Sequence, residues 1–411
     1  MALSSAVPAG ASPAAAPGRG LLPLLLVANT AMYSLYIGVA GILLALQVEQ
    51  VDPADKVSNF GLIAGVSAIF ATVFNPVAGA LSDRSGRRNP WILGGGLAAV
   101  PAMLLLGLAD TILLITLAWC LGQAVMNVYQ AALTSVVPDR VPMTARGKAS
   151  AAVGLGLPFG SALGALAGAA FAEDYRTGYL LFGAIVAVAA LLFTGCTRER
   201  RLPARAPLPV RAQLAAFASA LRDHDFRWAF IGRALLVLGY FAVSGYQLYV
   251  LQDHTVLPAG MKPEAAVAVL TPLTSVAMAV STVLGGWLSD RLDRRKLFVG
   301  ASALLSAVAL AIPAVSASWS AMLAFAVVNG LAFGCYMAVD TALVTMVLPR
   351  AEDAARDMGV LNVANAGPQI VAPFVASVVV SVSGGYTALF LVAAALAVAG
   401  ALAVRPIRGV R

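Results

Sequence analysis

The feature that most limits the fold of this chain is a series of long apolar stretches that are nearly free of charged residues. A helix that crosses a bilayer needs about 20 consecutive, mostly apolar residues. Twelve stretches meet this requirement, and we therefore predict twelve transmembrane helices. They lie at residues 21–47, 58–81, 91–109, 112–137, 149–172, 178–196, 228–252, 265–288, 297–315, 320–347, 359–382 and 386–404.

The composition agrees with a membrane protein. Only 11% of the 411 residues are charged and 60% are hydrophobic, whereas a soluble domain typically has about 25% charged residues. Much of the exterior must therefore contact lipid. The three cysteines, Cys120, Cys196 and Cys335, lie singly in apolar runs without metal or disulfide spacing. We expect them in the core, and we expect neither a metal nor a cofactor.

The basic residues test both the helix count and the orientation. The net charge of +8 comes from short basic blocks between the apolar stretches, which indicates membrane topology and argues against a nucleic-acid partner. With a cytoplasmic N-terminus, 23 of the 27 Lys and Arg residues fall inside, and only Lys56, Arg176 and Lys262 fall outside. The positive-inside rule then places both termini in the cytoplasm. We predict a multi-pass plasma-membrane protein. The excess of Arg over Lys, with abundant Ala, favours a bacterial inner membrane.

The chain divides into two halves. Its longest connection, 197–227, is rich in Arg and Pro and has six predicted helices on each side. We predict a disordered N-terminal tail at 1–20, a six-helix bundle at 21–196, a cytoplasmic linker at 197–227, a second bundle at 228–404 and a cytoplasmic tail at 405–411.

An internal repeat relates the halves. Residues 79–88 read GALSDRSGRR after the second stretch, and residues 286–295 read GWLSDRLDRR after the eighth. The connections at 134–146 and 345–356 also match. Two landmarks in the same order and spacing indicate two pseudo-symmetric six-helix bundles.

The loop at 79–88, with its degenerate copy at 286–295, resembles the signature of the major facilitator superfamily, and the resemblance covers all twelve helices. It implies that the two bundles rock about a central site that opens alternately to each side. It also implies a gradient-driven secondary transporter rather than an enzyme. Its partners would be a small-molecule solute, a proton or cation as coupling ion, and the lipid bilayer. We expect a monomer.

Three functions remain open. The run at 356–369, RDMGVLNVANAGPQ, resembles the eleventh helix of sucrose-type and glycoside cation symporters, which implies proton-coupled transport of a sugar-like or other neutral polar solute. An antiporter that exports a drug or secondary metabolite is the alternative, favoured by a predominantly apolar, aromatic cavity. A receptor or scaffold without transport is the third. A membrane-embedded enzyme would need clustered His, Asp or Cys at depth, and only Asp340 qualifies.

The repeated loops also suggest a latch. An Asp at a helix end among several Arg can accept charge-assisted hydrogen bonds and face the N-terminus of a neighbouring helix. Such contacts would stabilise one state of a transporter and break in the other. Alternatively, these charges only fix the topology. The residues that we assign to the latch are Asp83, Arg84, Arg87, Asp290 and Arg294.

Polar stripes mark the expected solute pathway. In this superfamily the first, fourth, seventh and tenth helices line the cavity. Residues at i, i+4 and i+7 share a helix face, and amides without partners in hydrocarbon are costly. Tyr and amides together suit a neutral polar or mixed solute, although each residue could instead bridge two helices. The candidates are Asn29, Tyr33, Tyr36, Gln123, Asn127, Gln130, Tyr240, Gln247, Asn329 and Tyr336, and from the eleventh helix Asn362, Asn365 and Gln369.

One carboxylate falls inside a predicted helix. Asp340 precedes Pro349 by nine positions, about two helical turns inside the membrane, and an intramembrane carboxylate is by default a functional hypothesis. Arg233 lies a similar distance inside the seventh helix. We expect Asp340 to carry a proton or to pair with Arg233 at a cytoplasmic gate. A static ion pair, or an Arg233 that extends to the membrane surface, is the alternative.

Overall fold

The structure is a computed structural model that describes residues 20–142, 145–199, 219, 221–346 and 354–408. Within these residues twelve helices are long and apolar enough to cross a membrane. The predicted all-α fold with twelve transmembrane helices is therefore confirmed. The predicted tail at 1–20 and linker at 197–227 lie mostly outside the described residues, as does the end of the tail at 405–411.

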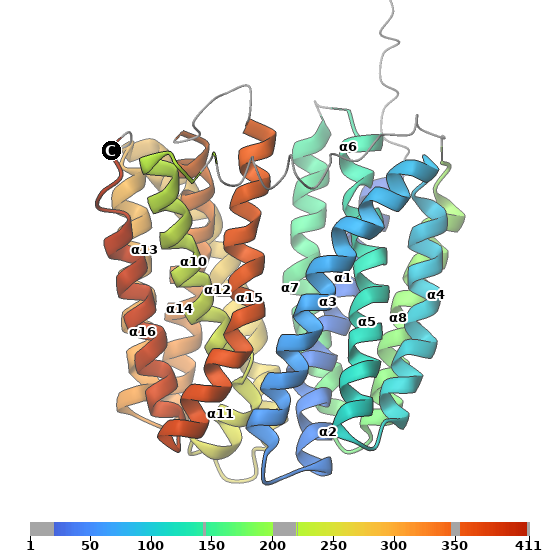
Figure 1. Cartoon of the computed structure of the whole chain (residues 1–411), viewed down its shortest axis with the longest axis horizontal. Helices are drawn as coiled ribbons and strands as arrows, with labels where there is room; N and C mark the ends of the chain where they lie inside the picture. Colours follow the sequence, from blue (N-terminus) through green and yellow to red (C-terminus); the bar gives the residue numbers. More distant parts are fainter. Residues whose placement is uncertain (1–19, 143–144, 200–218, 220, 347–353, 409–411) are drawn as a thin grey trace, which may run out of the picture.

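The first six spans form one bundle (Figure 1). The first span is continuous from Leu21 to Val51 and contains a π-helical segment, η1, in its middle. A short helix, α6, follows the fourth span. The elements are α1 (Leu21–Leu35), η1 (Tyr36–Leu43), α2 (Leu44–Val51), α3 (Lys56–Ser85), α4 (Asn89–Leu108), α5 (Ile112–Thr134), α6 (Val136–Arg140), α7 (Arg146–Ala170) and α8 (Tyr175–Cys196).

The last six spans form the second bundle beside the first (Figure 1). The seventh span is followed by a short helix, α11. The elements are α10 (His224–Ser244), α11 (Gln247–Asp253), α12 (Pro263–Leu292), α13 (Arg295–Val315), α14 (Trp319–Met346), α15 (Ala354–Ser383) and α16 (Tyr386–Ala403). Most predicted boundaries are off by a few residues because helices such as α3 continue past their apolar part into charged residues.

The two faces differ in how closely the bundles meet. We call the face with the α3–α4 connection and the end of α16 the inner face, following the predicted orientation, and the opposite face the outer face. In Figure 1 the ribbons of α7 and α15 stand apart near the inner face, and the bundles converge at the outer face. There the Tyr249 hydroxyl donates to the Ala45 carbonyl at 2.8 Å, and the Tyr246 hydroxyl donates to the Val57 carbonyl at 3.1 Å.

A seam of glycines joins α7 to the first span. A Cβ at Gly156, Gly160 or Gly164 would lie 2.5–2.6 Å from atoms of α1, and one at Gly168 would lie 3.1 Å from the Ile42 side chain of η1. Association of helices in lipid depends on such close packing of small residues, because lipid tails are as apolar as the helices. The seam therefore fixes α7 against the helix that carries Tyr33 and Tyr36.

The second helix of each half ends in the same backbone conformation. Helix α3 ends at Gly86 in the left-handed conformation (φ 62°), and α12 ends at Asp293 in the same conformation (φ 50°). The two positions correspond in the repeat. Gly adopts this conformation at no steric cost, whereas a residue with a Cβ is strained there, Asp less than most.

We expect opposite effects from exchanging the residue types at these helix ends. Gly86→Ala should lower the free energy of unfolding by about 1 kcal/mol, and Asp293→Gly should leave it unchanged or raise it slightly. Thermal unfolding in detergent measures both. Gly300→Ala is the control, because a Cβ there meets open space in a regular helix, so it should not destabilise. Equal losses for Gly86→Ala and Gly300→Ala would contradict the role of backbone conformation.

Candidate functional site

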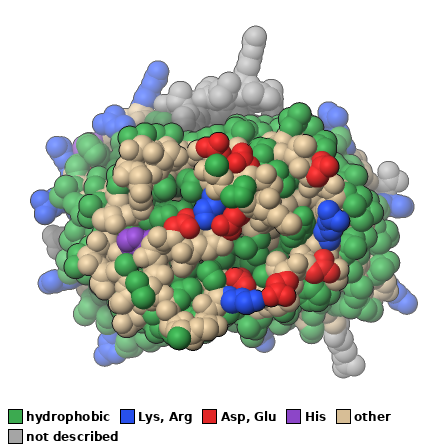
Figure 2. All heavy atoms as spheres, turned by 90° about the horizontal axis from the view of Figure 1, so that it is seen from below, with side chains coloured by type: hydrophobic (Ala, Val, Ile, Leu, Met, Phe, Trp, Pro, Cys, Tyr) green, Lys and Arg blue, Asp and Glu red, His purple; other side chains and the backbone are tan. Residues whose placement is uncertain are grey.

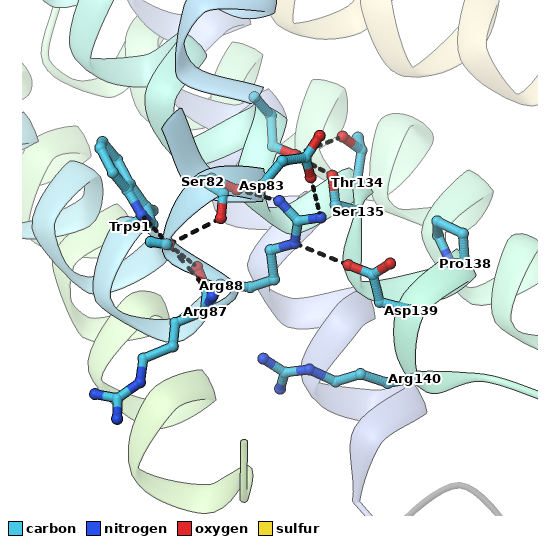
Figure 3. Close-up of polar contacts among 12 residues, drawn as sticks. Ser82, Asp83, Arg87, Arg88, Trp91, Thr134, Ser135, Pro138, Asp139 and Arg140 are labelled. Atoms are coloured by element: carbon cyan, nitrogen blue, oxygen red, sulfur yellow. Dashed lines mark hydrogen bonds and ion pairs between the residues drawn. The ribbon is translucent and has the colours of Figure 1, made fainter. Parts of the chain in front are cut away.

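The charged loop on the inner face is organised around Arg88. The Arg88 guanidinium binds Ser82 and Asp83, and its Nε lies 2.8 Å from Oδ2 of Asp139 after α5 (Figure 3). Arg88 is only 5% exposed. Burial opposes its charge, but the hydrogen bonds to the two carboxylates outweigh burial and raise the pKa of Arg88. The loop therefore holds a network around a buried arginine that links α3 to α6.

A third carboxylate, that of Glu199, extends this network to the residues just after α8. Glu199 Oε1 accepts from the Asn89 backbone amide at 2.9 Å and from Arg140 at 2.8 Å, and it also accepts from the Arg88 amide. These amides belong to the first turn of α4, whose N-terminus favours an anion. All of these residues belong to the first bundle. In this conformation Asp83 is therefore engaged within its own half.

The arginines that pair with Asp83 and Asp290 are not the ones predicted from the sequence. Arg84 and Arg87 are exposed, and in Figure 3 Arg87 points away from Asp139. In the second half Arg294 is exposed, and Arg295 binds Asp290 at 2.7 Å. The pairing Arg follows the Asp by five residues in both copies. Aligning the two loops does not single out this Arg, because Arg84 and Arg87 align with Arg291 and Arg294 as well. The latch role of Asp83, Asp290 and the three selected arginines stays a prediction.

Removing Arg88 should destabilise the first bundle far more than removing its neighbour. Arg88→Ala takes a partner from the Asp139 side chain, which is 2% exposed, and loss of one partner from a buried ion pair costs about 3 kcal/mol or more. Arg87→Ala removes the same charge from an exposed site and should stay within about 0.5 kcal/mol of wild type. Denaturation in detergent of the two variants checks this. Equal stability would show that the buried network contributes nothing.

Three of the predicted pathway amides are used inside their own bundle. Asn29 donates to the Leu25 carbonyl of its own helix and lies against Gly156 of α7. Asn127 accepts from Asn75 of α3 at 3.0 Å, and Asn329 accepts from Ser306 of α13 at 2.9 Å. All three are buried. Asn127 and Asn329 therefore fit the alternative that such amides bridge two helices, whereas the hydrogen bond of Asn29 stays within its own helix.

The aromatic residues predicted to line the pathway make fewer hydrogen bonds than these amides. Tyr33 and Tyr36 of the first span are partly exposed, and the Tyr36 hydroxyl reaches Gln130 Oε1 of α5 at 3.4 Å. Tyr240 of α10 stacks on Phe333 of α14, with ring centroids 3.8 Å apart and planes inclined by 16°. Such offset aromatic pairs offer an apolar face to a flat solute.

The remaining candidates are spread over three helices. Gln123 and Gln247 are partly exposed, and Gln369 is exposed and donates to the Asn365 carbonyl at 3.1 Å. The side-chain oxygen of Asn365 has no hydrogen-bond partner within the described part of the chain. The side chain of Asn362 lies outside the described residues. Solute contact by the candidate residues stays a prediction.

Asp340 and Arg233 meet inside the second bundle. Arg233 Nε lies 2.6 Å from Asp340 Oδ2, and Arg233 Nη2 donates to Thr341 Oγ1 at 2.9 Å. Arg233 is 3% exposed and Asp340 is 1% exposed. The phenol of Tyr336, one turn before Asp340, is buried, and its hydroxyl has no hydrogen-bond partner among the described residues. Since α10 and α14 belong to one bundle, the pair does not itself connect the halves.

The three cysteines and the possible metal ligands were also considered in the sequence predictions. Cys120 is buried and Cys335 is partly buried, but Cys196, at the end of α8, is exposed, contrary to the core position expected for it. Among the described residues, no group of three or more His, Cys, Asp or Glu could hold a metal ion.

Comparison with known proteins identifies the family. The sequence profile of the Major Facilitator Superfamily matches residues 24–255 and 255–410. The chain belongs to this superfamily. It is therefore a multi-pass membrane transporter, as the repeated Asp-Arg loops predicted.

Similar curated proteins include one that is named an efflux protein. "Multidrug resistance protein MdtG" of Citrobacter koseri is 32% identical over 149 residues, 35% of this chain and 35% of that protein. The match thus spans about a third of that relative's length. The "Fujikurins efflux protein" of Gibberella fujikuroi is 24% identical over 84% of this chain and 72% of its own. "MFS transporter asaE" of Aspergillus flavus is 22% identical over 80% and 73%.

Solved structures share the fold. A peptide transporter POT in complex with sulfate matches with a TM-score of 0.77 at 14% identity, covering 95% of both chains. A bacterial homologue of the human lysosomal transporter Spinster, in an inward-facing and unoccupied conformation, matches with a TM-score of 0.71 at 16% identity, again over 95% of both chains. At these identities the likeness establishes the fold and says nothing of the solute.

Proposed function

We propose that this transporter exports an amphiphilic organic compound, a drug or secondary metabolite, in exchange for protons. The observation that carries the proposal is the enclosed Arg233–Asp340 pair within 2.6 Å. It is a titratable group at membrane depth, where an ionisable residue usually serves transport. The stacked Tyr240–Phe333 pair and the names of two relatives, a multidrug resistance protein and an efflux protein, support an amphiphilic solute.

The arrangement of the bundles supports alternating access. The contacts of Tyr246, Tyr249 and Lys56 join the halves at the outer face. We infer an inward-open state. We also infer that the protein lies in a bacterial inner membrane, with both termini on the cytoplasmic side. In this state a solute would enter from the cytoplasm or the inner leaflet. We infer a monomer as the working unit.

The ion pair offers a physical route for coupling. With Asp340 ionised, the pair is neutral in sum and can stay enclosed. A proton on Asp340 neutralises the carboxylate and leaves the Arg233 charge enclosed without its counter-ion, which is strongly unfavourable. A conformation that gives Arg233 access to water or to another anion is then favoured. Binding of one proton would thus shift the equilibrium between the two states.

Transport of a sugar-like solute is the second candidate. The run at 356–369 favours it, together with the Asn365 side-chain oxygen that has no partner in the described part of the chain. A neutral sugar would use several such amides, whereas a flat amphiphile would use the aromatic faces of Tyr240 and Phe333.

The role of the ion pair is separable from its effect on folding. Asp340→Asn alone should destabilise the protein by about 3 kcal/mol, because Arg233 stays enclosed without a counter-ion. The double variant Arg233→Met with Asp340→Val replaces both charges by apolar groups and should recover most of that stability. We expect it to fold but to lose proton-driven transport. A double variant that transports with the wild-type pH dependence would eliminate Asp340 as the coupling group.

The direction and solute class are tested in proteoliposomes. With an imposed proton gradient, we expect movement of a planar aromatic amphiphile against the proton flux and none of a disaccharide. Tyr240→Ala should raise KM several-fold for the amphiphile, since stacking on an aromatic face contributes about 1 kcal/mol. Fluorescence of the solute and radiolabelled disaccharide uptake measure the two cases. Proton-driven disaccharide uptake without amphiphile transport would contradict the export proposal and support proton-coupled symport of a sugar.

A further inference from the structure

On the outer face one ammonium group lies between the two bundles. Lys56 begins α3, and its Nζ lies 2.8 Å from Glu49 Oε1 and 2.9 Å from Asp253 Oδ1. It also reaches Gln252 Oε1 at 3.4 Å and lies 5.0 Å from the centre of the Tyr249 ring. Figure 2 shows this face, where Lys and Arg side chains near the middle lie against Asp and Glu. A single cation is thus shared by two carboxylates.

The two carboxylates belong to different halves. Glu49 lies at the end of the first span, in the same bundle as Lys56, whereas Asp253 ends α11 in the second bundle. If the outer ends separate, Lys56 can keep Glu49, but it must leave Asp253. Of the two ion pairs of Lys56, only the pair with Asp253 therefore depends on the outer ends being together.

Further contacts hold this group in place. The Tyr386 hydroxyl donates to Asp253 Oδ2 at 3.2 Å and orients its carboxylate. Gln252 Nε2 donates across the halves to Glu49 Oε2 at 2.9 Å. The side chain of Lys56 is 15% exposed, and those of Glu49 and Asp253 are 30% and 38% exposed. The ammonium is thus shielded more than an ordinary surface lysine, and its charge is screened less by solvent.

We propose that Lys56 is the outer latch of the transporter and that its two carboxylates act in opposite directions. Asp253 holds the outer face closed. Glu49 competes for the same ammonium and gives it a partner after opening, so that Glu49 makes the latch releasable. A group shifts a two-state equilibrium only by the difference between its interaction energies in the two states. By this measure Asp253 favours the closed outer face, and Glu49 favours the open one. The proposal concerns the gate alone and does not depend on the solute or its direction.

The chain provides a reporter for this gate. Ser58 of α3 and Ser381 of α15 face each other across the outer seam, with their hydroxyl oxygens 3.3 Å apart. In a background with Cys120, Cys196 and Cys335 replaced by Ala, Ser58→Cys with Ser381→Cys should form a disulfide when the outer face is closed. The cross-linking rate in proteoliposomes without solute then reports the closed population.

Three single changes should move this rate. Asp253→Asn and Lys56→Gln should each slow cross-linking about threefold, the scale of a partly exposed ion pair. Glu49→Gln should speed it, because its amide oxygen can still accept from Gln252 while Lys56 loses its competing partner. The exchange Lys56→Asp with Asp253→Lys should restore cross-linking to at least the wild-type rate, because the cation then lies in the second half and both carboxylates lie in the first. Such a recovery also shows that the single variants fail through charge and not through misfolding.

The matched control is the other ion pair between the halves. Lys262 and Glu173 lie 2.5 Å apart, but their side chains are 63% and 83% exposed, so this pair should contribute little. Glu173→Gln removes one outer carboxylate and should leave the cross-linking rate unchanged. Equal slowing by Glu49→Gln and Asp253→Asn would overturn the proposal of opposite roles. Unchanged rates in all three single variants would show that Lys56 is not the latch.

Discussion

Hydrocarbon offers no hydrogen-bond partner, and the whole structure depends on this constraint. Twelve helices satisfy their backbones internally, and several polar side chains inside the membrane find partners within the protein. Asn127 binds Asn75, Asn329 binds Ser306, and Arg233 binds Asp340. Polar groups that need water are left at the two faces, where the charged networks of Arg88 and Lys56 lie. The parts of the molecule suited to switching between states are therefore at its ends.

The two charged networks differ in a way that matters for the transport cycle. The partners of Arg88 described above lie in its own half, so this network can keep its contacts when the bundles move apart. Lys56 has one partner in each half and must change partners. In the conformation described, the first network stabilises a bundle and the second connects the bundles. The same chemistry of Arg or Lys with carboxylates thus serves two purposes according to which helices supply the partners.

The fold could be predicted from the sequence because its determinants are local. Apolar stretches of membrane length and the asymmetry of Lys and Arg follow the order of the chain, and the repeated loops at 79–88 and 286–295 relate the halves. The contacts of the candidate site were harder to predict from the sequence. Arg88 and not Arg87 pairs with Asp83 because of how the chain turns after Gly86, and this depends on backbone geometry.

Contacts between distant segments were also invisible in the sequence. Lys56 reads as an isolated outer charge, and only the packing of α11 against the first span brings Asp253 to it. Periodicity placed Asn29 on the same stripe as Tyr33, but whether an amide faces a neighbouring helix or a solute is decided by which helix lies beside it. For Asn29 that neighbour is the glycine face of α7.

This glycine face has a mechanical consequence. At Gly156, Gly160 and Gly164 the space that a side chain would fill is taken by atoms of α1, including backbone atoms, so α7 and the first helix cannot slide past each other without breaking dense packing. The two helices must therefore move as one rigid piece. A displacement of α7 is therefore carried directly to the rings of Tyr33 and Tyr36, so that in the proposed cycle opening at the inner face and movement of these rings would be a single motion.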